Sequence, residues 1–404
     1  MSDDSNNFGG PPPGGPGQPP QSQPQGQQGG FGQPGQGQPQ GGFGQPQGQG
    51  GFEQPAGQPQ PGEYGGPPAG YGGAPAPAVQ ANENGRWKAI ARWIARRYGV
   101  NVAPALAIDA HRRLMAILRL ANAVAALSME GLAAPRDSID AAIEQVHPQP
   151  GVARVATALR RYLAGSGVRV ARLQAPVSYR IVPQIHGAFL HALDGLRQRV
   201  EQSLRGFTDN PLMVLDDSPA GGRLLSVGLF HDQHLVNQVE QVALALAHLG
   251  ALAERRLHRL LNPGFSGLTP QLAPRPGLDA GLVVVQKASL DIVARLKWLA
   301  QPLSLQVGEG SGGQEDYMAM AFPAIQRLHE MAGLAHLLLA HELLTALVAV
   351  DQRGEPVGEG LARLRQALRA RIPALDRDRA PGADLERLLA ITADGAFQAL
   401  LLDL

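Results

Sequence analysis

From about residue 105 onward, the apolar positions of the chain recur every three or four residues, which is the spacing of one face of an α-helix. This pattern predicts long helices over residues 109–132, 230–261, 278–300 and 316–350. At ~1.5 Å per residue, the second of these would be about 45 Å long. Strand-like alternation is nearly absent, and even the valine run at 283–285 lies within a helical pattern. The expected fold class is therefore all-α, a bundle of long helices.

Three turn sequences separate the helical patterns. Asp-Asn-Pro at 209–211 and Asn-Pro-Gly at 262–264 combine turn-forming residues with a proline that cannot continue a helix. The third is the glycine-rich stretch at 308–313. We expect a helix to stop at each of these three sites.

Residues 1–85 have a different pattern, with almost no aliphatic side chains among glycine, proline and glutamine. They cannot bury enough apolar surface to offset the entropy of ordering, so we expect a disordered tail, followed by one helical domain over residues 86–404. The tail repeats a short unit, GGFGQP at 29–34 and 41–46 and GGFEQP at 50–55. Polar tracts with isolated aromatic rings act as inert linkers or as weak self-association segments.

The stretch GRWKAIARWIARRYGV at 85–100 marks the change in composition. Arranged as a helix, it has an apolar face of Trp87, Ala91, Ile94 and Tyr98 and a basic face of Lys88, Arg92 and Arg96. Such a helix either lies on an anionic membrane or docks on its own domain. We expect it to dock on its own domain.

The charge of the chain is small and scattered. Its 35 basic and 34 acidic residues give a net charge of +1, which divides into −5 for residues 1–85 and +6 for the rest. Such a weak charge does not indicate a nucleic-acid partner. The chain has no cysteine, which excludes disulfides and thiol nucleophiles and agrees with a reducing compartment. No signal-peptide pattern and no uninterrupted apolar stretch of roughly 20 residues is present, so we expect a cytoplasmic protein without a membrane partner.

The stretch QVGEGSGGQEDYMAMAF at 306–322 allows two interpretations. Gly308, Gly310 and Gly313 match the G-x-G-x-x-G spacing of a dinucleotide-binding loop. However, a helical pattern precedes them where a strand is needed, and the acids that follow would repel a phosphate. In the second interpretation, which we favour, Glu315 and Asp316 begin a helix whose dipole stabilises their carboxylates, and the glycines let the loop approach a ligand.

Six stretches of the chain carry a family resemblance through their order and spacing. They are LQAPVSYRIVPQIHGAF at 173–189, GFTDNPLMV at 206–214, LLSVGLFHDQHL at 224–235, LALAHLGALAERRLHRLLNPGFSGLTPQL at 244–272, GLDAGLVVVQ at 277–286 and GGQEDYMAMAF at 312–322. Together they resemble the aromatic amino acid ammonia-lyases, the histidine and phenylalanine ammonia-lyase family, over residues 105–355. The resemblance implies an all-α homo-oligomer, a tetramer, in which each active site is built from several subunits.

The resemblance also implies an aromatic amino acid ligand, because the family removes ammonia and a β-proton from such amino acids. The amine is a poor leaving group, and family members activate it with a methylidene-imidazolone electrophile that forms from an internal Ala-Ser-Gly. This chain contains no Ala-Ser-Gly. It has no thiol as a substitute, and its three lysines, Lys88, Lys287 and Lys297, lack the phosphate-binding cup of a pyridoxal site. We therefore expect no cofactor.

Five site residues of the family can be carried over to this chain. The family's Q-x-x-Y-S-x-R element keeps its glutamine and its carboxylate-binding arginine, G-N-F-H keeps its phenylalanine, and N-Q-E-D keeps its glutamine and glutamate. The resemblance thus implies a substrate-binding set of Gln174, Arg180, Phe230, Gln314 and Glu315, with no catalytic residue. Alternatively, the arginine and the glutamate form a buried structural pair at a helix interface.

Other family positions have changed. The tyrosine of the first element is Val177, the asparagine of the second is Leu229, and the asparagine of the third is Gly313. The asparagine of the family's L-N-G-T can be matched only to Asn101, and only with a three-residue gap.

The 11 histidines are dispersed along the chain. His341-Glu342 lacks the second histidine, four residues on, that a zinc-protease helix needs, so we expect no metal site. His231 and His234 lie at the predicted start of a helix, and we expect them to cap it or to pack rather than to bind metal.

Three hypotheses of function follow, in this order. The first is a pseudoenzyme that is inactive alone and forms a homo-oligomer. The second is one subunit of a split ammonia-lyase or aminomutase, a hetero-oligomer completed by a partner chain that carries the Ala-Ser-Gly electrophile. In the third, the tail and the basic helix from Trp87 to Tyr98 recruit the helical domain to membranes or condensates as a scaffold.

Overall fold

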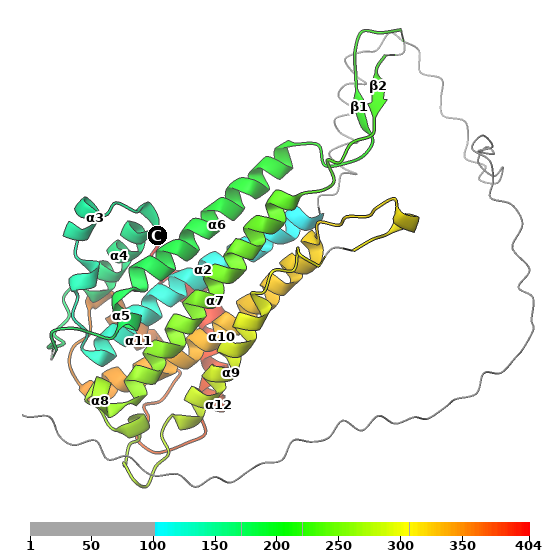
Figure 1. Ribbon diagram of the computed structural model, residues 1–404. Coiled ribbons are helices and arrows are strands. Elements are labelled where there is room, and N and C mark those ends of the chain that lie inside the picture. Colours follow the sequence, from blue (N-terminus) through cyan, green and yellow to red (C-terminus); the bar gives the residue numbers. More distant parts are fainter. Residues whose placement is uncertain (1–101, 171, 220, 307) are drawn as a thin grey trace, which may run out of the picture. The chain divides into compact units, whose positions relative to one another are not determined.

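The computed structural model describes residues 102–404, with the exception of residues 171, 220 and 307. The predictions for the tail, for segment 86–98 and for Asn101 therefore lie outside the described residues, as does the scaffold hypothesis. For the part of the chain that is described, the expected all-α fold is confirmed (Figure 1).

Long helices form a bundle at the centre of the domain. They are α2 (Val102–Leu132), α6 (Val182–Arg205), α7 (Gln233–Leu261), α9 (Val283–Leu299) and α10 (Ala321–Arg353). Helices α2, α7, α9 and α10 correspond to the four helices predicted from apolar spacing. The predicted stops at 209–211 and 262–264 follow the ends of α6 and α7, and the stop at 308–313 lies between α9 and α10.

The two longest helices, α2 and α10, run side by side in the same direction. Near their starts His329 Nε2 lies 3.3 Å from Leu106 O, and near their ends Arg353 Nη2 donates to Gly131 O at 2.8 Å. Figure 1 shows α7 running in the same direction as these two, with α6 and α9 running in the opposite direction.

The C-terminal halves of α2 and α10 form the core of the bundle. Every residue from 120 to 132 in α2 and from 338 to 350 in α10 is buried. By length and composition both helices also meet the requirements of a membrane span, but 83% of the relevant window in each is buried within this fold. Helices that are apolar on all sides belong to the centre of a large domain, which explains their composition.

Shorter elements connect and flank the long helices, and the β-hairpin projects from one end of the bundle (Figure 1). The strands β1 (Leu212–Val214) and β2 (Arg223–Leu225) pair antiparallel, with Leu212 opposite Leu225. The remaining elements are η1 (Asp137–Ile139), α3 (Ala142–Val146), α4 (Pro150–Leu163), α5 (Val177–Arg180), α8 (Pro263–Ser266), η2 (Pro270–Leu272), η3 (Ser311–Gly313), α11 (Glu359–Arg369), α12 (Gly382–Ala393) and α13 (Gly395–Gln398).

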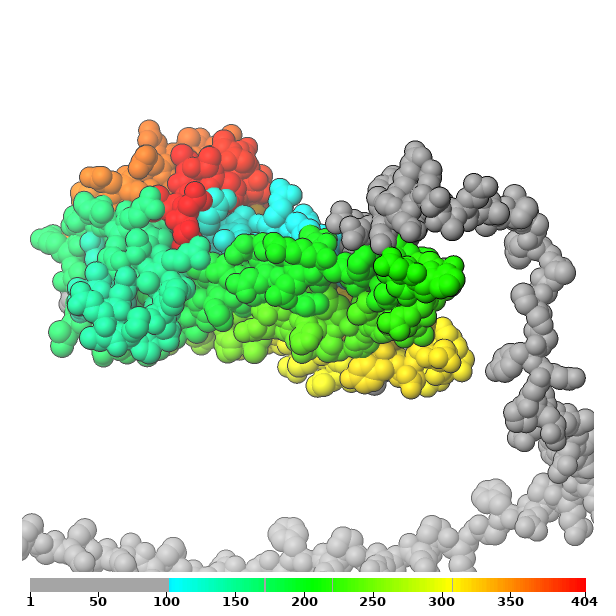
Figure 2. Space-filling view, turned by 90° about the horizontal axis from the view of Figure 1, so that it is seen from above, coloured from blue at the N-terminus to red at the C-terminus, as the bar shows by residue number. Residues whose placement is uncertain are grey.

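The bundle has two ends with different contents. The hairpin end consists of the first turns of α2, α7 and α10 together with the connecting segments 206–232 and 300–320. The α5 end consists of the last turns of the same helices together with α5 and α8. In Figure 1 and Figure 2, the green hairpin segment and the yellow 300–320 segment lie at the same end.

The prediction that α10 begins at residue 316 is wrong. Met320 precedes the helix with a φ of 57°, and Pro323 lies in the first turn, where the N–H group that proline lacks would have no helical partner. Glu315 and Asp316 therefore lie before the helix and not in its first turn. Helix α9 likewise begins at Val283 rather than at residue 278.

Candidate functional site

Three predicted site residues lie at the hairpin end. Phe230, with 48% of its surface exposed, is in the segment that precedes α7, and Gln314 and Glu315 directly follow the turn η3. All three side chains are exposed. No hydrogen bond or ion pair links the side chains of Gln314 and Glu315 to any other described residue.

The glycine loop has a geometry of its own. The N–H of Gly310 donates to Glu315 O at 2.8 Å, and the N–H of Glu315 donates to Gly310 O at 3.3 Å. Gly312 and Gly313, between them, have φ values of 65° and 87°, which glycine adopts without a steric penalty. Helix α9 and a turn precede this loop, with no strand in the described residues between them. The dinucleotide-binding interpretation therefore lacks the strand that it requires.

His231 connects the two segments of the hairpin end. Its ring centroid lies 5.7 Å from that of Tyr317, which places Phe230 and the glycine loop near each other. The packing role expected for His231 is confirmed. The cap of α7 is instead Asp232, whose Oδ1 accepts a hydrogen bond from Leu235 N at 3.0 Å.

The other two predicted residues, Gln174 and Arg180, lie at the α5 end. Arg180 is partly buried, and its Nε donates to Ala175 O at 3.0 Å, which orients the guanidinium group. No described residue is bonded to its two Nη groups. Gln174 is exposed, and its side chain also has no hydrogen-bond partner among the described residues.

The neighbouring Tyr179 does not replace the tyrosine that the family has at Val177. Tyr179 is buried and its hydroxyl donates to Arg256 O at 2.9 Å, so it anchors α5 to α7. Burial raises the pKa of Tyr179 well above its usual value, which keeps the hydroxyl a donor. Val177, by contrast, has 54% of its surface exposed.

The five predicted residues do not converge within one chain. Helix α7 separates the two groups, because Phe230 lies just before its first residue and Tyr179 contacts its last turns. Its 29 residues span about 44 Å at ~1.5 Å each. The alternative in which Arg180 and Glu315 form a buried pair is wrong, since they lie at opposite ends and Glu315 is exposed.

A different pair, Arg256 and Glu342, occupies the buried position between helices. Arg256 Nε donates to Glu342 Oε1 at 2.6 Å and Nη2 donates to Oε2 at 2.8 Å, while Ser128 Oγ donates to Oε1 at 2.7 Å. Both charged side chains have 0% exposure. The sequence contained a signal for this pair, because Arg256 continues the apolar stripe of α7 four residues after Leu252.

Buried histidines account for two further polar contacts of the core. His186 Nδ1 lies 2.7 Å from Asn122 Oδ1, and His341 Nδ1 lies 2.9 Å from Ser289 Oγ. Burial lowers the pKa of His341 to about 4, and burial and then the nearby Arg256 lower that of His186 well below 6.5. Both histidines are therefore neutral near pH 7. Across residues 102–404, with their three gaps, no group of three or more histidine or acidic side chains is placed so that it could hold a metal ion.

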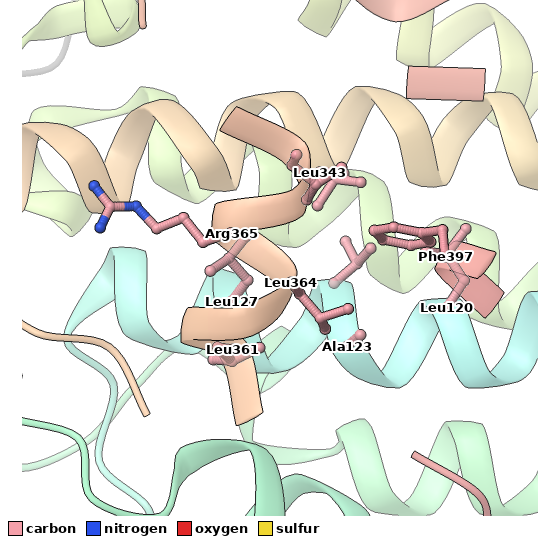
Figure 3. A pocket seen from close by; sticks show the side chains of 10 residues that line it. Leu120, Ala123, Leu127, Leu343, Leu361, Leu364, Arg365 and Phe397 are labelled. Carbon is pink, nitrogen blue, oxygen red and sulfur yellow. The ribbon is translucent and has the colours of Figure 1, made fainter. Parts of the chain in front are cut away.

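The cavities do not coincide with the predicted residues. An apolar cavity of about 10 Å³ lies between α2, α10, α11 and α13, with Arg365 at its edge directing its guanidinium away (Figure 3). One water molecule needs roughly 10–15 Å³, so this cavity is too small for an amino acid. An open hollow of about 380 Å³ lies between α6 and α7. It is lined by Gly195, Gln198, Arg199, Gln202, His234 and Gln238.

Comparisons with known proteins agree on one family. The family model described as aromatic amino acid lyase matches residues 95–370. Histidine ammonia-lyase from Anaeromyxobacter sp. (strain K) is 32% identical over 312 residues, which cover 74% of this chain and 60% of that protein. Histidine ammonia-lyase from Bacillus subtilis (strain 168) is 32% identical over 298 residues, which cover 72% of this chain and 57% of that protein.

Solved structures give the same result. Histidine ammonia-lyase from Trypanosoma cruzi matches with a TM-score of 0.68 and 27% identity, over 75% of this chain and 57% of that one. Tyrosine aminomutase from Streptomyces globisporus matches with a TM-score of 0.70 and 25% identity, over 75% of this chain and 62% of that one. The chain spans about 60% of the length of the curated relatives that it matches. From the extent of the family match and the identity to these relatives, we conclude that the chain belongs to the aromatic amino acid lyase family.

Proposed function

We propose that this chain is an aromatic amino acid lyase-like protein that eliminates no ammonia on its own, in effect a pseudoenzyme. The observation that carries the proposal is that its 404 residues contain no Ala-Ser-Gly. Without an electrophile the amine remains a poor leaving group, and side chains that only bind and orient the substrate do not remove this obstacle. The replacement of the family tyrosine by Val177 further supports the proposal.

The retained residues are suited to binding rather than to chemistry. Arg180 is oriented by Ala175 O, and its Nη groups are able to pair a carboxylate in two parallel hydrogen bonds. Glu315 offers an exposed carboxylate to an amine. Because about 44 Å of α7 separates them, a ligand that touches both requires at least two copies of the chain. The proposed assembly is therefore a homo-oligomer.

The first prediction is that the pure protein forms no product from histidine, phenylalanine or tyrosine. Urocanate, cinnamate and coumarate absorb strongly in the near ultraviolet, so a continuous absorbance assay detects very slow turnover. The histidine ammonia-lyase of Bacillus subtilis, assayed in parallel, is the positive control. Accumulation of any of the three products in proportion to the amount of this chain would refute the proposal.

A second candidate function, a subunit of a split lyase or aminomutase, is favoured by the side chains of Gln174, Gln314 and Glu315. All three are exposed and have no hydrogen-bond partner among the described residues, as expected of groups that await a ligand or a second chain. In this proposal a separate chain with Ala-Ser-Gly supplies the electrophile.

The split-lyase proposal predicts that a chain with Ala-Ser-Gly copurifies stoichiometrically from the native host and that the mixture is active. Arg180→Ala is then expected to reduce kcat/KM by roughly 100-fold, because the substrate loses its carboxylate anchor. Arg161→Ala, at an exposed position of α4, is the matched control and should retain full activity. A homo-oligomer with no second chain, purified from the same host, would contradict the split-lyase candidate. The pseudoenzyme proposal would then be retained.

A further inference from the structure

Exposed apolar side chains gather at the hairpin end. We define the hairpin-end surface as Leu229, Phe230, Tyr317, Met318 and Phe322, together with the acids Glu309, Glu315 and Asp316. Exposure of the five apolar members ranges from 36% for Met318 to 58% for Tyr317. The contact between His231 and Tyr317 joins the two segments into one surface. An apolar cluster of this kind, rimmed by charge, is typical of a docking site.

The acids of this surface have no counter-charge. Glu309, Glu315 and Asp316 are exposed, and none of them pairs with a basic side chain within the described part of the chain. The three carboxylates lie within eight residues of one another along the chain, so their repulsion favours a basic partner. The surface therefore fits a partner that is both apolar and positively charged.

Chain connectivity brings one such partner to the same place. Leu106 O lies 3.3 Å from His329 Nε2, and α2 and α10 run parallel. Val102 lies four residues before Leu106, and Ile325 lies four residues before His329, so Val102 is level with Ile325. Ile325 is about one turn from the start of α10 at Ala321. The chain that precedes Val102 thus starts beside the hairpin-end surface.

Segment 86–98 has the complementary chemistry. Its apolar face contains Trp87, Ala91, Ile94 and Tyr98, and the segment carries five basic residues. The chain has no acid between Glu83 and Asp109. As a helix its 13 residues would measure about 20 Å. Residues 99–101 add a link of at most roughly 10 Å, so the segment reaches the surface directly.

From these observations we infer that segment 86–98 docks on the hairpin-end surface of its own chain. Its apolar face covers Phe230 and Tyr317, and its basic residues flank the acids of the glycine loop. The docking itself is independent of the proposed function.

Lysine distribution gives a direct test. Lys88 is the one lysine before Lys287, so zero-length carbodiimide coupling joins the segment to a carboxylate at a single defined amine. In the full-length protein, mass spectrometry is expected to find Lys88 joined to Glu309, Glu315 or Asp316. Lys88→Gln should remove these crosslinked peptides and leave those of Lys287 and Lys297 unchanged.

Isotope mixing separates docking within one chain from docking between copies. An equal mixture of ¹⁵N-labelled and unlabelled protein, unfolded in urea and refolded together so that the copies mix, should give crosslinks to Glu309, Glu315 or Asp316 in which both peptides carry the same label. Mixed-label crosslinks would assign the surface to a second copy and overturn the inference. It would also be overturned if Lys88 were coupled only to other acids, or to none.

Tryptophan fluorescence provides a second measurement that does not depend on coupling. Of the three tryptophans, Trp298 is 76% exposed on α9, so a Trp298→Phe background reports only on Trp87 and Trp93. In that background, Glu309→Lys/Asp316→Lys should more than double the acrylamide quenching constant, because repulsion releases the segment. Asp376→Lys/Glu386→Lys, at exposed acids elsewhere, is the charge-matched control and should leave quenching unchanged. Equal quenching in both double variants would contradict the docking site.

Discussion

Replacing Glu342 with glutamine is expected to lower the free energy of unfolding by about 3–5 kcal/mol. Glu342 and Arg256 have 0% exposure, and three hydrogen bonds from Arg256 and Ser128 satisfy the carboxylate. Glutamine keeps the shape of the side chain but removes its charge, which leaves the guanidinium uncompensated in the core. Urea denaturation followed by circular dichroism measures the difference.

Two controls show whether the loss comes from the buried charge. Glu330→Gln breaks the exposed pair with Arg295, in which both side chains are at least half exposed, and should change stability by less than about 1 kcal/mol. The double variant Arg256→Met/Glu342→Leu removes both charges and is expected to recover most of the stability. If Glu342→Gln and Glu330→Gln had equal effects, the buried pair would not be an essential part of the fold.

Acidification from pH 6.5 to pH 5 is expected to destabilise the protein by about 2 kcal/mol through His341 alone. Burial lowers the pKa of this histidine from 6.5 to about 4, so between these values the unfolded chain binds a proton that the folded chain does not. The stabilisation is therefore complete above pH 6.5 and is lost as the pH falls toward 4. His186, with its pKa lowered in the same way, adds to the loss. Glu130 opposes this loss of stability on acidification, because burial raises the pKa of its carboxyl group and the folded chain therefore binds a proton more tightly than the unfolded chain.

Urea denaturation gives the free energy of unfolding of each variant at pH 6.5 and at pH 5. The difference between the two values is compared among variants, so any effect of the substitution that does not depend on pH cancels. His341→Gln should flatten the dependence by about 2 kcal/mol, since the titrating group is gone. His248→Gln, at an exposed position of α7, should retain the full dependence of the unmodified protein. An unchanged dependence in His341→Gln would show that His341 is not the group responsible.

The long helices could be predicted because each buries a wide apolar face, and burial of such a face sets a period of 3.6 residues in the sequence. Their boundaries were harder to predict where two signals competed. The acids at 315 and 316 favour a helix start, but the positive φ of Met320 and the position of Pro323 set the start of α10 at Ala321. Pro323 was the better signal, because it is tolerated only in a first turn.

Contacts between distant parts of the chain could not be derived from local pattern. Arg256 and Glu342 each stand out as a charge on an apolar face, but that they pair depends on how α7 and α10 pack. The same holds for the five site residues. The resemblance named Arg180 and Glu315, yet only the arrangement of α5, α7 and the glycine loop shows that they lie at opposite ends of the bundle.

The packing of α2 against α10 has a consequence for how the protein is made. About 190 residues separate the end of α2 from the start of its main partner. At ~5–20 residues per second, a ribosome needs roughly 10 to 40 s to supply that partner. During this interval the apolar C-terminal half of α2 is outside the ribosome without the helix that buries it. The order of the helices along the chain therefore leaves apolar surface of α2 without its main partner during synthesis, when such surface is prone to aggregation.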